Sequence, residues 1–270
     1  MWYYALRSMD LFLGTGSFSG RSRRQNASRP SFVGQATFNG CIAFTNWMRH
    51  EVEKLLPPEL ELATTTSSTT HFHPVVFIFG EQTEGTALFG GFTIPLGVAY
   101  NEFGMAIPFV KHRRGPYLHT FVARMYSSYF PATWNGNVHY GFSKEMAKMR
   151  WQGPVFTLTT EHDTPLLHIG VESGGAWLRG TFRDLENFEA VRDIFALPVV
   201  GRKSNGAYVC SHFGWDFSDA LVRAVKACIS IDAPFVDGLT PCECHSVSSG
   251  AFDVRGMLWK LSWPSPCDFR

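Results

Sequence analysis

Residues 140–148 read Tyr-Gly-Phe-Ser-Lys-Glu-Met-Ala-Lys and place one lysine, Lys144, directly after a Gly-Phe-Ser segment. Upstream, residues 100–102 read Tyr-Asn-Glu and offer a carboxylate at Glu102. On a short amphipathic helix Lys144 would be solvated, with Glu145 as a local counter-charge. In a cavity it would lose its hydration, which favours the neutral amine. It could then attack a ketone and form a Schiff base.

The order of these two stretches resembles the acetoacetate decarboxylase family. Tyr-x-Glu at 100–102 precedes Gly-Phe-x-Lys-x-x-Ala at 141–147, and Leu-Leu-Pro-Pro-Glu-Leu at 55–60 lies upstream of both. The match runs from residue 52 to residue 183, with an echo at 213–217. The resemblance implies a closed, conical β-barrel with a Schiff-base lysine in its interior. It also implies that Lys144 is this lysine and that Glu102 is the active-site glutamate.

One departure from the family pattern bears on the chemistry. Decarboxylases of this family read Gly-Arg-Glu and then Gly-Phe-Pro-Lys-Lys, whereas this chain reads Gly-Asn-Val at 136–138 and Gly-Phe-Ser-Lys-Glu at 141–145. Glu145 therefore replaces the second lysine, whose charge favours the neutral form of the first. A carboxylate beside Lys144 would stabilise the ammonium form, so burial alone would have to keep Lys144 nucleophilic.

We therefore expect a cofactor-independent Schiff-base lyase that acts on a small or medium keto acid. Lys144 would be the nucleophile and Glu102 the acid/base or orienting group. By resemblance the reaction is decarboxylation of a 3-oxo acid. An imine-dependent aldolase, dehydratase or cyclase is the alternative, because an iminium serves each of these reactions. A non-catalytic ligand-binding barrel, with Lys144 and Glu145 as an internal ion pair, is the second alternative.

Further residues are expected to contact the substrate. Tyrosines can donate hydrogen bonds in a cavity, and a cation would bind a substrate carboxylate. Arg113 and Arg114 are cation candidates, but Gly115 and Pro116 beside them favour a solvated turn. The predicted substrate-binding residues are Tyr100, Tyr140, Phe142, Glu145 and Arg124.

Metal binding has weak support in the sequence. Residues 242–245 read Cys-Glu-Cys-His and offer two thiolates and an imidazole, which suit zinc. Their spacing is not that of an ordinary zinc knuckle, and no second pair matches it. His71 and His73 could share one face of a strand, but no carboxylate follows at a fixed spacing, so a structural role is favoured. We expect neither a metal nor a cofactor.

Composition limits the class of protein. The chain has 270 residues, 45% hydrophobic and 17% charged, which suits one barrel domain. A net charge of +1 gives no reason to expect nucleic acid or an anionic membrane as partner. No apolar run approaches the roughly 18 residues that span a bilayer. The resemblance implies a homo-oligomer, although no stripe in the sequence shows one.

The cysteines and the N-terminus bear on location. Six cysteines are sparse and irregularly spaced, which favours free thiols and a reducing, cytoplasmic compartment. The Ser- and Arg-rich residues 1–30 offer an organelle transit segment as the alternative.

The sequence predicts a loose N-terminal arm over residues 1–37 and a single barrel domain over 38–270. Helices are predicted at 45–56, with Pro57 as its stop, and at 185–197. A short helical turn followed by a strand is predicted within 216–231. Turns are predicted at 81–85, 112–116 and 162–165. Alternating, β-branched and aromatic runs predict strands at 73–79, 86–95, 97–109, 118–130, 155–160, 166–171, 176–182, 208–213 and within 250–263. These runs favour an antiparallel barrel or sandwich. With the closed barrel that the resemblance implies, the expected fold class is mainly β, a closed antiparallel conical barrel with peripheral helices.

Overall fold

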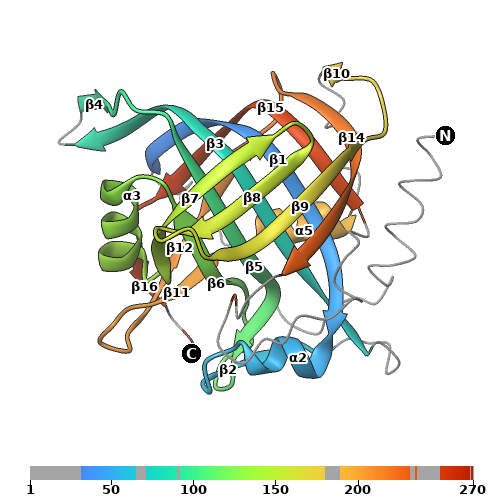
Figure 1. Cartoon of the computed structure of the whole chain (residues 1–270). Coiled ribbons are helices and arrows are strands. Elements are labelled where there is room, and N and C mark those ends of the chain that lie inside the picture. Colours follow the sequence, from blue (N-terminus) through green and yellow to red (C-terminus); the bar gives the residue numbers. More distant parts are fainter. Residues whose placement is uncertain are drawn as a thin grey trace.

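The computed structural model describes residues 32–64, 71–89, 92–179, 189–231, 235, 250–267 and 269. Four helical segments are α2 (Arg49–Lys54), α3 (Phe130–Asn135), the π-helical turn η1 (Gly136–Tyr140) and α5 (Glu189–Ala196). Strands make up most of the rest (Figure 1): β1 (Phe32–Met48), β2 (Leu60–Leu62), β3 (Phe72–Phe89), β4 (Phe92–Pro95), β5 (Tyr100–His112), β6 (Leu118–Ser127), β7 (Lys144–Gln152), β8 (Val155–Thr160), β9 (Pro165–Ser173), β10 (Leu178–Arg179), β11 (Val199–Arg202), β12 (Tyr208–Ser211), β13 (Phe213–Asp216), β14 (Leu221–Ile231), β15 (Gly250–Ser262) and β16 (Ser265–Pro266).

Nine of these strands close into a ring. Their order is β6-β7-β8-β9-β14-β15-β1-β3-β5, and β5 pairs back onto β6. Neighbours in the ring are antiparallel except for β6 and β7, which run parallel. A closed ring leaves no unpaired edge along its wall. The predicted fold class, a mainly β protein with a closed and mostly antiparallel barrel, is confirmed.

The inner face of the ring is a packed core. Alternate side chains of all nine strands join one buried cluster, and only the inside of a closed ring can bring them together. Aromatic rings dominate it: the ring centroids of Phe79 and Phe156 lie 4.9 Å apart, and those of Phe103 and Phe156 lie 6.3 Å apart. Burying each such side chain contributes about 1.5–3 kcal/mol. Side chains fill the interior of the ring, so its role is structural.

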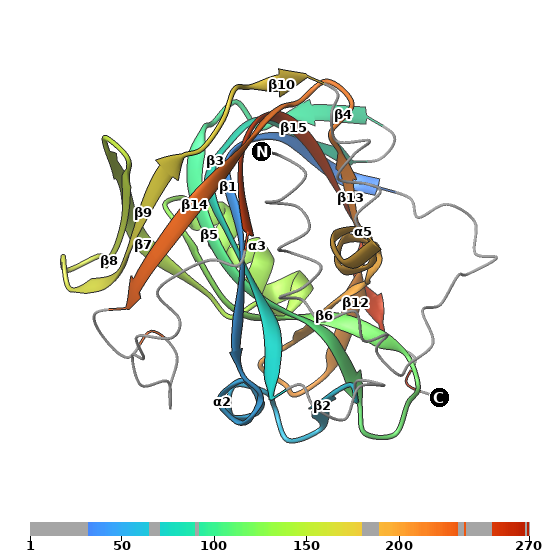
Figure 2. The same ribbon diagram turned by 90° about the vertical axis from the view of Figure 1, so that its right-hand side faces the viewer.

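A second layer covers the outer face of β15, β1, β3, β5 and β6. It consists of α5, β11, β12 and β13, and Figure 2 shows α5, β12 and β13 on one side of this wall. β13 pairs with β15, and β11 pairs in parallel with β6. A second buried cluster joins the two layers, including Phe38 and Phe44 on the wall and Ile194 from α5. The candidate site lies between these layers.

The predicted helix over residues 45–56 is half wrong. β1 continues to Met48, and only Arg49–Lys54 is helical. Trp47 is fully buried opposite His73, and the Thr45 hydroxyl donates to the carbonyl of Val75 at 3.1 Å. Pairing with β3 therefore overrides the helical pattern of the first residues.

The turn predicted at 81–85 is also absent, because β3 runs through it as one strand. β1 pairs with this segment from Thr37 opposite Thr83 to Asn39 opposite Glu81. Gln82 is buried in this segment, and its side chain contacts Glu102.

Two other predictions concern the N-terminal arm and the second predicted helix. Residues 32–37, assigned above to the N-terminal arm, form the first part of β1, and residues 1–31 lie outside the described residues. The helix predicted at 185–197 is present as α5, with residues 185–188 outside the described part. None of the described helices is long and apolar enough to cross a membrane.

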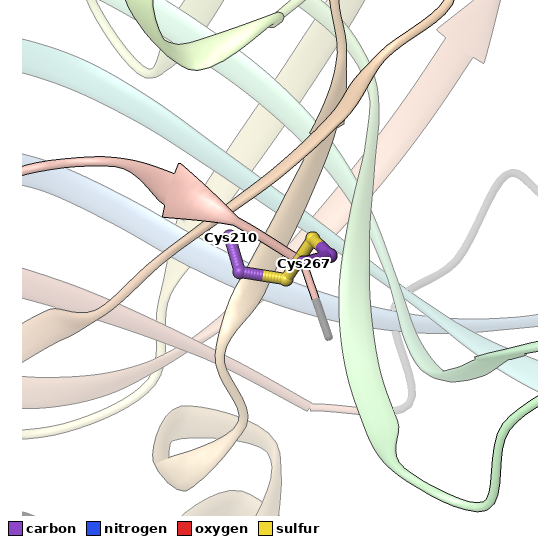
Figure 3. The surroundings of a disulfide bond; sticks show 2 residues. All are labelled: Cys210 and Cys267. Atoms are coloured by element: carbon purple, nitrogen blue, oxygen red, sulfur yellow. A yellow bond between two sulfur atoms is a disulfide. The ribbon is translucent and has the colours of Figure 1, made fainter. Parts of the chain in front are cut away.

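A disulfide joins Cys210 of β12 to Cys267 (Figure 3). The expectation of free thiols is wrong for this pair. The two residues are 57 apart in sequence, but β12 pairs with β16, which places Cys210 opposite Ser265. Among the described residues, Cys41 and Cys228 are free thiols.

Candidate active site

Lys144 is the first residue of β7, and the chain before it is shaped to hold it there. α3 runs into η1, which ends at Gly141 with a positive φ of 65°. A side chain at Gly141 would also meet the backbone of Arg202 at 2.7 Å, so glycine is required for both reasons. The chain then reverses into β7. Lys144 thus follows a turn whose backbone conformation is constrained at Gly141.

Asn137 fixes the backbone of Lys144. Its Oδ1 accepts from the Lys144 amide at 2.8 Å, and its Nδ2 donates to the Lys144 carbonyl at 2.7 Å. Gly136 lies under the side chain, since an added Cβ there would stand 3.0 Å from Lys144 Cδ. Gly136, which matches the family pattern, and Asn137, which departs from it, therefore place the lysine.

The Lys144 side chain is buried and meets a carboxylate. Its Nζ donates to Glu102 Oε1, and the two side chains are 6% and 14% exposed. Glu102 and Lys144 come together because β6 lies between β5 and β7: Glu102 is opposite Ser127, and Met125 is opposite Lys144. The structure thus brings the two side chains into contact, while their roles stay predictions.

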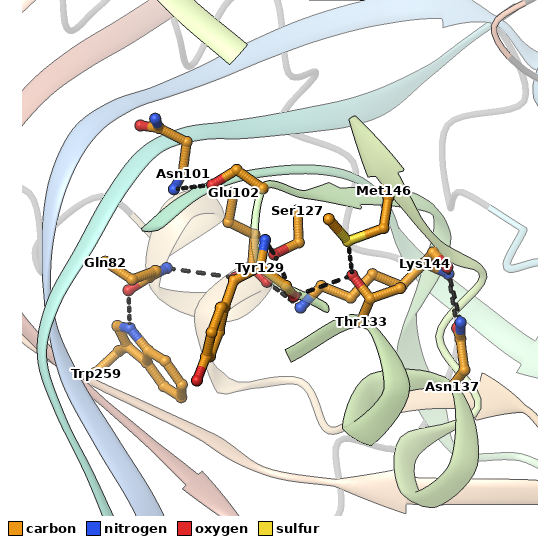
Figure 4. Close-up of polar contacts among 11 residues, drawn as sticks. Gln82, Asn101, Glu102, Ser127, Tyr129, Thr133, Asn137, Lys144, Met146 and Trp259 are labelled. Atoms are coloured by element: carbon orange, nitrogen blue, oxygen red, sulfur yellow. Dashed lines mark hydrogen bonds and ion pairs between the residues drawn. The ribbon is translucent and has the colours of Figure 1, made fainter. Parts of the chain in front are cut away.

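Glu102 is held from its other side by a short relay (Figure 4). Gln82 Nε2 donates to Glu102 Oε2 at 3.4 Å, and Trp259 Nε1 donates to Gln82 Oε1. The Gln82 amide therefore points its N–H donors at the Glu102 carboxylate, while its oxygen accepts from Trp259. The relay orients Glu102 and joins β3, β5 and β15 at the site.

Glu145 does not face Lys144. Successive side chains of a strand point to opposite faces, and Glu145 is 56% exposed on the other face of β7. A register shift in β6, between Val122 opposite Ala106 and Arg124 opposite Met105, turns Arg124 to that same face. Arg124 Nη1 donates to Glu145 Oε1 at 2.8 Å. The internal ion pair between Lys144 and Glu145, considered above as an alternative, is thus absent. Lys144 pairs with Glu102 instead, and Glu145 pairs with Arg124.

The predicted aromatic residues pack against other aromatic rings. The Tyr140 and Phe142 rings stack at 5.6 Å, and Phe142 packs on Phe213 at 6.5 Å. Burial raises the pKa of Tyr140 to about 12. Burial, then the nearby Glu102 and Tyr129, raises the pKa of Tyr100 above its ordinary value. Both phenols therefore keep their protons at neutral pH and can donate hydrogen bonds.

A cavity opens between the ring wall and the second layer, with an empty volume of about 870 Å³ including its mouth. Glu102 and Gln82 line it, and most other lining residues are apolar. Lys144 is not among the lining residues, but it contacts Glu102, which is. Tyr100, Tyr140, Phe142, Glu145 and Arg124 lie outside the lining. A ligand in the cavity would meet Glu102 before Lys144.

The arginines proposed to bind a carboxylate lie elsewhere. Arg113 Nε donates to the carbonyl of Pro58 at 2.7 Å, and its Nη1 lies 3.4 Å from Glu61 on the surface. Arg114 is exposed in the predicted turn. No lysine or arginine is found among the described residues that line the cavity.

The metal hypotheses gain no support. Across the described ranges, no group of three or more potential ligands is close enough to hold a metal ion. His73 is buried and its Nε2 lies 2.8 Å from the carbonyl of Pro108, while burial lowers its pKa to about 4. His71 is exposed, and residues 242–245 lie outside the described residues.

Sequence reasoning missed three residues of the site. Gln82 was assigned to a turn, and Trp259 and Asn137 were given no role. Asn137 lies seven residues before Lys144, so an amide side chain shortly before the lysine motif was the only sequence signal for its role. Gln82 and Trp259 meet Glu102 only through pairing of distant strands, which no local pattern reveals.

The chain matches no protein-family model and no curated protein. Among solved structures, it is similar to acetoacetate decarboxylase from Legionella pneumophila, with 12% identity, coverage of 93% of this chain and 98% of that one, and a TM-score of 0.56. An acetoacetate decarboxylase-like enzyme from Sphingomonas wittichii has 13% identity, coverage of 94% and 100%, and a TM-score of 0.58. The enduracididine biosynthesis enzyme MppR, complexed with the condensation product of pyruvate and imidazole 4-carboxaldehyde, has 13% identity, coverage of 94% and 98%, and a TM-score of 0.56. The resemblance to the acetoacetate decarboxylase-like family is thus confirmed at the level of the fold.

Proposed function

We propose that this protein is a cofactor-independent enzyme that forms a Schiff base between Lys144 and the keto carbonyl of a small or medium keto acid. One observation carries the proposal: a buried lysine amine contacts a carboxylate at the wall of a largely apolar cavity. Lysines are rarely buried without a partner or a use, and a desolvated pair costs several kcal/mol unless its geometry is good. A catalytic role explains why such a pair is kept beside a cavity.

The contact between Lys144 and Glu102 supports each proton transfer that imine formation needs. Glu102 takes a proton from the ammonium group and leaves a neutral amine. The amine nitrogen bonds to the carbonyl carbon, and a proton moves from nitrogen to the former carbonyl oxygen to give a carbinolamine. Glu102 then returns its proton to the hydroxyl, which leaves as water, and an iminium remains on Lys144.

The iminium can then take one of two routes. In a 3-oxo acid, the bond to the carboxylate breaks, its electrons enter the iminium to form an enamine, and carbon dioxide leaves. This is the reaction implied by the resemblance. Alternatively, a neighbouring C–H bond loses its proton and the enamine serves an aldol, dehydration or cyclisation step. The likeness to MppR, whose structure holds a condensation product of pyruvate and imidazole 4-carboxaldehyde, supports this second route.

Borohydride trapping tests the proposal. The purified protein is incubated with acetoacetate, pyruvate or acetone and reduced with sodium borohydride. Its intact mass is then measured by mass spectrometry. We expect a stable adduct of one substrate residue in the wild type. It should be absent from Lys144→Ala and retained by the matched control Lys148→Ala, which changes an exposed lysine of the same strand.

The gas released distinguishes the two routes. Carbon dioxide from acetoacetate, lost together with the adduct in Lys144→Ala, would support decarboxylation. An adduct without carbon dioxide would support the aldolase, dehydratase or cyclase route. A well-folded wild-type protein that forms no adduct with any carbonyl compound would favour a non-catalytic, ligand-binding barrel instead.

A further inference from the structure

The cavity has one polar end and a long apolar body. Glu102 and Gln82 form the polar end, next to Lys144, and Thr120 is a single hydroxyl elsewhere in the lining. The body lies between two walls that share an apolar character. The ring wall contributes Phe38, Ile78 and Val122, and the second layer contributes Phe195, Phe213 and Trp215.

The direction of β5 gives the length of this body. Glu102, Gly104 and Ala106 line the cavity from the same face of the strand. Ala106 lies opposite Val76 on one side and Val122 on the other, and both also line the cavity. At about 3.3 Å per residue, the four steps along the strand from Glu102 to Ala106 span about 13 Å. The apolar body therefore extends well beyond the reach of a three- or four-carbon substrate.

We propose that the substrate of this site is a carbonyl compound whose carbonyl carbon carries an uncharged alkyl or aryl arm of about 13 Å. This inference rests on the proposed function for the position of the carbonyl, which lies at the polar end beside Lys144. The arm removes apolar surface from water along the body of the cavity. A charge on the arm would be buried without a described cation to pair with it, which is strongly unfavourable.

A series of methyl ketones tests the arm. Acetone, methyl propyl ketone and methyl heptyl ketone are trapped with borohydride at increasing concentration, and the half-saturating concentration is read from the adduct mass. We expect about fourfold tighter binding for each added methylene until the cavity is full. The methyl ketone of the same length that ends in a carboxylate should bind at least tenfold more weakly than methyl heptyl ketone. Equal half-saturation across the series, or tighter binding of the charged ketone, would overturn the proposal.

Filling the cavity at Ala106 tests the location. Ala106→Phe should weaken the binding of methyl heptyl ketone strongly and the binding of acetone far less, because acetone is the shorter ligand. Ala106→Val, a smaller change, should give an intermediate effect and covers the case in which the larger variant fails to fold. Ala207→Phe, at an exposed turn position, is the matched control and should behave as the wild type. Unchanged affinity for the long ketone in both Ala106 variants would contradict the assigned cavity.

A ligand that cannot form an imine separates this inference from the proposed function. Propyl and heptyl alcohol are titrated into the wild type by calorimetry. Length-dependent binding of the alcohols, with no ketone trapped, would support the ligand class and contradict the imine. Trapping of acetone without any length dependence among ketones or alcohols would support the imine and contradict the arm.

Discussion

Lys144 and Lys148 come from the same strand and the same face of that strand, yet they differ in almost every physical respect. The Lys144 side chain is 6% exposed and contacts Glu102, whereas Lys148 is 41% exposed and lies 2.7 Å from Asp163, itself 68% exposed. β7 pairs with β6 only from Lys144 to Met146, and α3 packs over this end of the strand. Burial under a neighbouring element, and not residue type, distinguishes the candidate nucleophile from an ordinary surface lysine.

The two pairs also differ in what they contribute to stability. An exposed pair gains little, because water screens it and two long side chains lose freedom. A buried pair depends on its partner, since removing one member leaves an unpaired charge away from water. The predictions below use this contrast, in order of decreasing effect.

The largest effect is expected on the rate of imine formation. Glu102→Gln keeps the shape of the side chain but removes its ability to exchange protons. We expect the rate, measured by stopping the reaction with borohydride at timed intervals, to fall by about 10²–10⁴-fold. Asp163→Asn, the matched change at the Lys148 pair, should leave the rate as in the wild type. Equal rates in both variants would show that Glu102 has no part in proton transfer.

The next effect is on the free energy of unfolding. Lys144→Ala should cost about 3–5 kcal/mol in urea denaturation, because Glu102 is then buried without its cation. Lys148→Ala should change stability by far less. A double variant, Lys144→Met with Glu102→Gln, should recover most of the loss because no buried charge remains unpaired. A similar loss in the two single variants would mean that the buried and exposed pairs do not differ as described.

Burial also predicts a pH dependence of stability through His73. Burial, together with the nearby Arg49 and opposed by the bond to Pro108, lowers its pKa in the folded protein to about 4. The unfolded chain, with its ordinary value, binds the proton first as pH falls. His73 thus contributes full stability above about pH 6.5 and loses it as pH falls toward 4, by about 3 kcal/mol.

Urea denaturation at several pH values from about 7 down to about 4 measures this loss. His73→Phe should flatten the pH dependence in this window. If the variant retains the same slope as the wild type, another buried group is responsible.

The smallest effect is expected at Glu145. Because it lies on the opposite face of β7 from Lys144, Glu145→Lys should leave the rate of imine formation nearly unchanged. The same change next to a facing lysine would have favoured the neutral amine and raised the rate. A clear gain of activity would show that Glu145 does sense Lys144. Timed borohydride trapping measures both outcomes.

Sequence reasoning could find Lys144 and Glu102 because each stands in a short motif, and their order along the chain matched a known family. It could not place Glu145, because the direction of its side chain relative to Lys144 depends on whether the segment is a helix or a strand. Only in a strand do the two neighbouring side chains point to opposite faces. Gln82 was lost for a related reason. Its polar neighbours suggest a turn, but continuous pairing with β1 keeps it in a strand.

The same reasoning explains the errors in the fold. The many short alternating runs predict a barrel or a sandwich, and only the family resemblance implies that the barrel is closed. The boundary between β1 and α2, and the disulfide between Cys210 and Cys267, depend on pairing with strands far away in sequence. Such contacts leave no local signal.

Peptide mapping of the borohydride-reduced wild-type protein tests the central claim most directly. The protein is trapped with methyl heptyl ketone and digested, and adducts on the peptides that carry Lys144 and Lys148 are compared in the same sample. The account predicts an adduct at Lys144 and none at Lys148. Adducts spread equally over both lysines, or found at Lys148 alone, would contradict it, because burial beside Glu102 would then confer no special reactivity.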